Sequence, residues 1–151
     1  MKFDILHQPD SAIAKIDLDP MEEILAEAGA MVAMSSHMDV NTTLRKGKGG
    51  GVLGGLKRVL AGESLFLSTF RSGDRPAEIY LAPKMMGDIL PYTLNGNQLV
   101  IQSTGYLACT GGVDIDLGFQ GLKSVFSGES LFWLTASGHG LVLLSAFWRD
   151  L

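Results

Sequence analysis

Residues 56–66 read LKRVLAGESLF, and residues 122–132 read LKSVFSGESLF. Eight of the eleven aligned positions are identical, and the Thr69 and Thr135 that follow match at the same offset of 66 residues. Self-similarity at a fixed spacing is typical of a chain that holds more than one copy of a structural unit. This block therefore sets the expected architecture of the whole chain.

Weaker matches lie upstream at an offset of 76 residues, namely Ile13 with Ile89, Leu18 with Leu94, and Gly29 with Gly105. The change in offset indicates a longer loop in the first copy, at about residues 41–55. Only a short turn-rich segment, residues 82–88, joins the copies. We therefore expect one domain over residues 1–151, with an internal repeat at about residues 11–83 and 87–148.

Short apolar runs separated by glycine-containing turns fill the second copy. Strands are expected at residues 98–102, 106–110, 113–117, 131–135 and 141–144, with turns at 95–97, 110–112 and 137–140. Strands at this spacing are typical of a sandwich or barrel. The pattern predicts an all-β fold of two repeated units, arranged as a sandwich or a barrel.

Residues 20–28 of the first copy, PMEEILAEA, have the composition of a helix. They align with residues 96–104 of the second copy, which have a strand pattern. Because equivalent copies share their structure and tertiary context overrides propensity, we expect a strand here. A single helical turn is expected at Leu56–Leu60 and again at Leu122–Phe126.

The composition restricts the class of protein. Apolar residues make up 46% of the chain, charged residues 19%, and the net charge is −4. A surface built wholly to bind nucleic acid would need a basic field, so that class is disfavoured. One cysteine excludes a disulfide framework within the chain. With no signal-peptide or membrane-spanning pattern, a cytoplasmic protein without a transmembrane segment is expected.

The repeated Gly-Glu-Ser triplet, which comprises Gly62, Glu63, Ser64, Gly128, Glu129 and Ser130, allows two interpretations. The glutamates could be paired carboxylates and the serines nucleophiles. Alternatively, the glycine makes a turn and the serine begins a strand that buries the Leu-Phe pair after it. A catalytic pair is rarely copied intact into both halves of a repeat, so we expect the structural role, and no catalytic residues.

One charged segment could bind a ligand. Arg45, Lys46, Lys48, Lys57 and Arg58 are five basic residues in a stretch without acidic ones. A solvated, mobile Gly-rich loop is the simpler interpretation. The alternative is a nucleic-acid or anionic-ligand site, although base-stacking aromatic residues are absent from it.

Metal and cofactor sites are not expected. His7, His37 and His139 lack metal-ligand spacing. The methionines Met31, Met34 and Met38 are expected in the core, and Cys109 as a buried, inert thiol. The sequence at Gly49–Gly54 matches Gly-x-Gly-x-x-Gly, but no apolar strand precedes it, so no dinucleotide site is predicted.

The GESLF block, the Gly-rich approach to it, residues 29–33 and the 82–89 join resemble the altered-inheritance-of-mitochondria protein 24 family over about Met1–Phe147. The resemblance implies a fold like the tryptophan RNA-binding attenuation protein, a double-stranded β-helix or sandwich. It implies no catalytic residues. Members of this family usually have longer chains that contain a third related unit. The resemblance therefore implies that the third unit is missing here.

The segment Gly140–Trp148 is almost wholly apolar. Lying at the end of the chain, it is expected to form an uncovered edge strand that pairs with another copy. The sequence thus predicts a non-enzymatic β-rich assembly or interaction protein that forms a homo-oligomer, a dimer or trimer.

Overall fold

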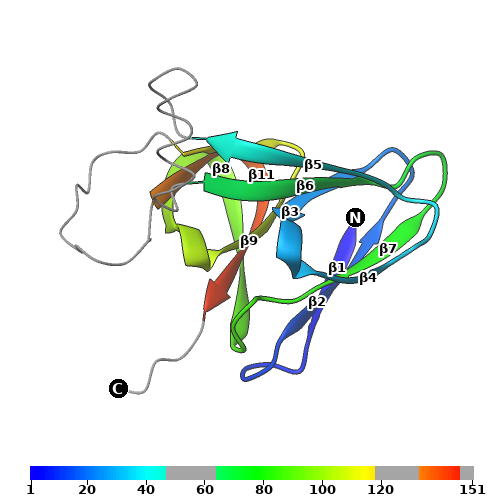
Figure 1. Cartoon of the computed structure of the whole chain (residues 1–151), viewed down its shortest axis with the longest axis horizontal. Coiled ribbons are helices and arrows are strands. Elements are labelled where there is room, and N and C mark those ends of the chain that lie inside the picture. Colours follow the sequence, from blue (N-terminus) through cyan, green and yellow to red (C-terminus); the bar gives the residue numbers. More distant parts are fainter. Residues whose placement is uncertain (47–63, 118–132, 147–151) are drawn as a thin grey trace.

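The computed structural model describes residues 1–46, 64–117 and 133–146 (Figure 1). These residues form eleven strands and two short 3-10 turns, and they contain no α-helix. The strands are β1 (Lys2–Leu6), β2 (Ile13–Leu18), β3 (Glu23–Glu27), β4 (Met31–Met34), β5 (Asp39–Lys46), β6 (Ser64–Arg71), β7 (Ala77–Leu81), β8 (Asp88–Gln102), β9 (Tyr106–Thr110), β10 (Val113–Asp116) and β11 (Trp133–Ala146). The turns are η1 (Ala28–Ala30) and η2 (Ser103–Gly105). The expected all-β class is confirmed.

The strands build two antiparallel sheets. One has the order β1-β2-β7-β4, and the other has the order β10-β11-β9-β3-β6-β5, with β8 also paired to β11. We call residues 13–81 the N-terminal half and residues 88–146 the C-terminal half. In Figure 1 the strands β5 and β6 lie side by side, while β1, β2 and β7 lie on the far side of β3 from β9.

The pairing of β2, β7 and β4 recurs in the C-terminal half. In the first case Ile16 lies opposite Ile79, which also pairs with Met34. In the second, Tyr92 of β8 lies opposite Val142 of β11, which also pairs with Cys109 of β9. Each three-stranded set also has an irregular register at the same place, where β4 meets β7 and where β9 meets β11.

The pairing of β3, β6 and β5 recurs in the same way. Phe70 of β6 lies between Ile24 of β3 and Val40 of β5. Ala136 of β11 lies between Leu99 of β8 and Ile115 of β10. Thus β8 corresponds to β2 followed by β3, and β11 corresponds to β6 followed by β7.

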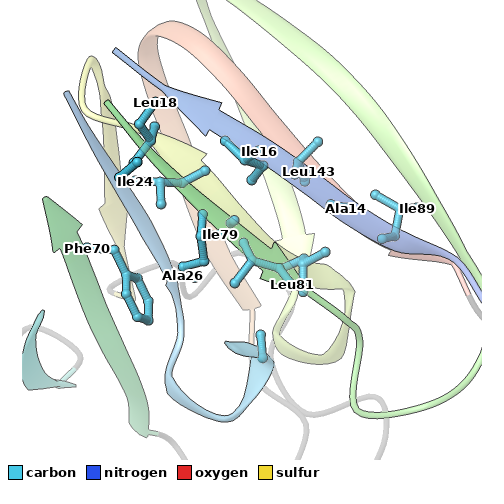
Figure 2. Close-up of a cluster of buried hydrophobic side chains, with 14 of the residues drawn as sticks. Ala14, Ile16, Leu18, Ile24, Ala26, Phe70, Ile79, Leu81, Ile89 and Leu143 are labelled. Carbon is cyan, nitrogen blue, oxygen red and sulfur yellow. The ribbon is translucent and has the colours of Figure 1, made fainter. Parts of the chain in front are cut away.

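Two clusters of buried side chains fill the molecule. The first cluster is made mainly by the N-terminal half, including Ile16, Leu18 and Phe70, but it also takes in Ile89, Leu107 and Leu143 of the C-terminal half (Figure 2). The second cluster is made mainly by the C-terminal half, and Leu67 and Leu25 of the N-terminal half pack into it. Each half therefore contributes side chains to the cluster made mainly by the other half.

Several local expectations can be compared with the structure. Residues 23–27 form β3, so the strand expected in place of a helix is present. The turns expected at 95–97 and 137–140 are wrong, because β8 and β11 run through them. Gly96 (φ 85°), Gly138 (φ 103°) and Gly140 (φ 151°) have backbone angles that glycine adopts easily, so they bend a strand without ending it.

The expectation of an uncovered strand at Gly140–Trp148 is also wrong for residues 140–146, while Phe147 and Trp148 lie outside the described residues. Residues 140–146 of β11 pair with β8 on one side, and Val142–Leu144 pair with β9 on the other. Val142 and Leu143 are buried. The apolar character of this segment therefore reflects a central strand, since strands pair with both of its edges and the side chains of Val142 and Leu143 are buried on opposite faces.

Candidate functional site

Of the five basic residues that could form a site, only Arg45 and Lys46 lie among the described residues. Arg45 and Lys46 are the last two residues of β5, where their backbones pair with Leu65 and Ser64. The segment that was expected to be a loop from residue 41 is therefore strand as far as residue 46. Lys48, Lys57 and Arg58 lie outside the described residues, as do the helical turns expected at 56–60 and 122–126.

Of the six Gly-Glu-Ser residues, Ser64 alone lies among the described residues, at the first position of β6. This position agrees with a serine that begins a strand. Phe66, which was expected to be buried, is 54% exposed. The remaining triplet residues, Gly62, Glu63, Gly128, Glu129 and Ser130, lie outside the described residues.

Side chains of the types that ligate metal ions do not cluster in the part of the chain that the structure describes. Among the described residues no group of three His, Cys, Asp or Glu side chains is close enough to hold a metal ion. Cys109 is buried, and its Sγ lies 3.3 Å from the Tyr106 hydroxyl oxygen, within hydrogen-bonding distance. Of the three methionines expected in the core, Met38 is buried, Met34 is half-buried and Met31 is exposed.

Asp19, Glu22 and Ser72 form a hydrogen-bonded corner, and its two acidic residues contact the Met1 nitrogen. Ser72 is fully buried, and its Oγ accepts a bond from the Glu22 backbone N–H at 3.0 Å. The same hydroxyl donates to the Asp19 carbonyl at 2.7 Å. Because this hydroxyl is satisfied by backbone groups and has no adjacent base, it serves the fold and is not an activated nucleophile.

Two carboxylates bind the Met1 ammonium. Asp19 Oδ2 and Glu22 Oε1 each lie 3.0 Å from the Met1 nitrogen. Their hydrogen bonds raise the pKa of the Met1 amine above its ordinary value of 8.0. The ammonium in turn lowers the pKa of Asp19 below its ordinary value of 3.8. Asp19 is solvent-exposed, whereas Met1 and Glu22 are half-buried, and an ion pair this open to water anchors β1 only weakly.

An open hollow of about 670 Å³ lies beside this corner, between Phe3 and Met21 on one side and Thr110 and Leu141 on the other. Its acidic lining residues already have partners, since Glu22 binds the Met1 ammonium and Glu23 Oε2 binds Arg71 Nε at 2.9 Å. Among its described lining residues, the hollow thus presents no unpaired carboxylate and no base next to a nucleophile. Its geometry supports no named reaction.

Two strand edges without a partner strand are the most distinctive feature of the described residues. In the described part of the chain, β4 pairs only with β7, and β8 pairs only with β11. The unpaired edge of a strand presents free backbone N–H and C=O groups to solvent. These groups can form hydrogen bonds with an incoming strand.

The sequence of an edge decides how available it is. The other edge strands carry charges, such as Lys2 and Asp4 in β1 and Asp114 and Asp116 in β10. Charged side chains and proline protect edges from unwanted pairing. By contrast, β4 (MVAM) and residues 98–102 of β8 (QLVIQ) contain neither charge nor proline.

Apolar side chains near these edges are exposed. Val32 in β4 is 58% exposed, and Val100 in β8 is 39% exposed. Sequence reasoning missed this surface because it expected Met31 and Met34 in the core and placed the open edge at the C-terminus. The absence of charges in MVAM and QLVIQ was a visible signal, but edge position depends on the tertiary fold.

No helix that could cross a membrane is found among the described residues.

Comparison with known proteins gives a family and a fold. The model of the family described as Mitochondrial biogenesis AIM24 matches residues 3–148. An uncharacterised protein of Streptococcus pyogenes serotype M6 is 30% identical over 97% of this chain, which spans 61% of that protein. A crystal structure of a Streptococcus pyogenes protein, solved as a structural-genomics target, is similar with a TM-score of 0.68 and 25% identity; this chain is 97% covered and spans 64% of it.

Proposed function

The chain belongs to the Mitochondrial biogenesis AIM24 family, and from this premise we propose that it is a non-enzymatic assembly or interaction protein whose working surface is formed by the unpaired edges of β4 and β8. The proposal includes self-association into a dimer or trimer. The similar proteins are uncharacterised, so no activity is taken from them.

The composition of the two edges carries the proposal. A strand edge without charge, proline or a covering strand is a template for pairing with another chain. β4 and residues 98–102 of β8 both have these properties and also expose Val32 and Val100. Pairing there would satisfy backbone groups and remove apolar surface from water in one step.

The use of the polar side chains supports the non-enzymatic part of the proposal. The buried Ser72 hydroxyl is bonded to backbone groups, and the acidic residues near the open hollow are bound to Met1 and Arg71. Cys109 is a buried thiol, which favours a structural role and a reducing compartment such as the cytoplasm.

We also propose that the two halves are copies of one unit and that the fold is of the double-stranded β-helix type, like that of the tryptophan RNA-binding attenuation protein. The recurring registers support the first part, since Ile16–Ile79 and Tyr92–Val142 occupy equivalent places in their sheets. The similarity in fold does not transfer a ligand.

Light scattering on the purified protein at micromolar concentration tests the proposal. We expect a mass of two or three times 16.2 kDa that falls on dilution or stays constant for a tight oligomer. A mass of 16.2 kDa at every concentration would contradict self-association.

The alternative function, binding of nucleic acid or another anion through Arg45, Lys46 and the basic residues that follow, is tested separately. We expect no salt-dependent retention on immobilised RNA or heparin. Retention that weakens steeply with salt and is lost in a Lys46→Glu, Lys48→Glu variant would favour the alternative.

A further inference from the structure

The junction between the two halves shows how one half binds another. β3 of the N-terminal half pairs with β9 of the C-terminal half, with Leu25 opposite Cys109 and Ala26 opposite Ala108. The hydroxyl of Tyr106 donates a hydrogen bond of 2.7 Å to the Leu25 carbonyl across the junction. The contact is therefore made first by strand pairing.

Apolar side chains complete the junction in both directions. Leu25 and Leu67 of the N-terminal half pack into the second cluster. Ile89, Leu107 and Leu143 of the C-terminal half pack into the first cluster, where Figure 2 shows Ile89 and Leu143 with the N-terminal residues. Each half thus packs some of its side chains into the core of the other half, and its own core contains side chains of the other half.

The shared registers identify the counterparts of these junction elements. β4 pairs with β7, and β9 pairs with the part of β11 that corresponds to β7. β4 is therefore the counterpart of β9. Residues 98–102 of β8 are likewise the counterpart of β3. In the described part of the chain, both counterparts lack the strand that covers the junction elements.

The exposure of the counterpart side chains follows the same rule. Leu107 of β9 is 1% exposed, whereas its counterpart Val32 in β4 is 58% exposed. Leu25 of β3 is half-buried at the junction, and its counterpart Val100 is exposed. The chain therefore carries both complementary surfaces of the junction a second time, unoccupied by its described residues.

We infer that a second copy of this chain binds at these surfaces, in the geometry of the internal junction; this rests on the proposed function. β4 of one copy pairs antiparallel with residues 98–102 of the next, with Met34 opposite Val100 and Ala33 opposite Ile101. Val32 then fills the place beside the C-terminal core that Leu107 fills beside the N-terminal one. Each copy carries both surfaces, so the same contact recurs from copy to copy and closes a ring.

Mixed single-cysteine variants test the register. In a Cys109→Ala background, Met34→Cys protein is mixed with Val100→Cys protein and oxidised. Residues directly opposite in antiparallel strands have Cβ atoms about 4.5–5.5 Å apart, close to the disulfide range. We expect a covalent dimer in the mixture only, formed at least about tenfold more than with Met31→Cys, which lies about 10 Å along the strand from Met34.

The outcomes separate the inference from the proposed function. An oligomer by light scattering that gives no Met34–Val100 cross-link overturns the register and leaves self-association standing. A cross-link within the Met34→Cys protein alone would show that β4 pairs with itself, which also overturns the inference. A monomer without any cross-link overturns the proposed function as well.

A matched pair of valine variants gives an independent readout. Val100 is 39% exposed and Val40 in β5 is 44% exposed, so either can become lysine without burying a charge. We expect Val100→Lys to raise the dissociation constant of the oligomer at least about tenfold, since a charged residue blocks an edge. Val40→Lys should leave it unchanged; equal effects of both variants would contradict the proposed surface.

Discussion

In the N-terminal half, five residues (72–76) separate β6 from β7, whereas in the C-terminal half the corresponding strand β11 continues through Gly138 and His139. The same contrast holds for the other corner. Residues 19–22 separate β2 from β3, while β8 continues through Asn95–Asn97. One arrangement of strands is therefore connected in two different ways.

The contrast shows which interactions each corner needs. The N-terminal corners are bound to each other, because Ser72 bonds to Asp19 and Glu22, and the Met21 N–H donates to the Gly73 carbonyl at 2.7 Å. The C-terminal corners rely on glycines with positive φ angles. The N-terminal corners also contain positive φ angles, at Met21 and Gly73, so the halves differ chiefly in the hydrogen bonds that Ser72 makes between the two corners.

The largest expected effect compares two counterpart residues at the junction. Leu107→Ala should lower the free energy of unfolding by about 2–5 kcal/mol, because it leaves a cavity in a shared core. Val32→Ala should change it by less than about 0.5 kcal/mol in dilute protein, since Val32 is exposed there. Urea unfolding at low concentration measures both, and an equal loss in the two variants would contradict the correspondence.

The second prediction concerns a glycine that has an alanine as its counterpart. Gly140 pairs with Leu94 as Ala77 pairs with Leu18. Gly140→Ala should cost about 3 kcal/mol, because φ is 151° and the added Cβ would lie against Thr110 Oγ1.

The control is the reverse change, Ala77→Gly, which should cost only about 0.5–1 kcal/mol through backbone entropy. Thermal or urea unfolding measures both variants. If Gly140→Ala is tolerated as well as Ala77→Gly, the glycine is not needed to bend β11.

The third prediction weakens the N-terminal corners. Ser72→Ala removes the hydroxyl that joins Asp19 to Glu22 and should cost about 1.5 kcal/mol of unfolding free energy. Ser36→Ala, at an exposed position in the β4–β5 turn, serves as the control and should be near neutral. A near-neutral Ser72→Ala would mean that the corners do not depend on their hydrogen bonds.

The smallest expected effect is a pH dependence of the N-terminal half. The lowered pKa of Asp19 adds stability above its unfolded value near 3.8, and that stability is lost as pH falls through the folded value. The raised pKa of the Met1 amine adds stability below 8.0, which is lost as pH rises through its folded value. Asp19→Asn should flatten both slopes in unfolding titrations; unchanged slopes would contradict this origin.

Much of the local structure could be predicted from the sequence. Residues 23–27 have helix-forming composition, yet comparison with the second half predicted the strand that is present. The pairing of Gly29 with Gly105 was close but shifted by one residue, since η1 and η2 align Ala30 with Gly105. Matching sequence therefore indicated the element but did not fix its register.

Tertiary features could not be predicted in the same way. Gly96 and Gly138 have the composition of turns, and only the pairing of β8 with β11 shows that they bend continuous strands. The apolar segment 140–146 has the pattern of an interaction strand, but a buried central strand has the same pattern. The edges of β4 and β8 are defined by which strands do not pair with them, so the uncharged sequences MVAM and QLVIQ do not by themselves identify edge strands.

The sharing of cores between the halves has a consequence for synthesis. The first cluster contains Leu107 and Leu143 beside residues such as Ile16 and Leu18. It therefore cannot be complete at the moment when only the N-terminal half has left the ribosome. Likewise, β3 pairs with β6 on one side, and its other side has no partner strand until β9 has been synthesised. Contacts this distant in sequence slow folding because loop closure precedes their gain. The nascent N-terminal half must therefore remain incomplete until nearly the whole described chain has been translated.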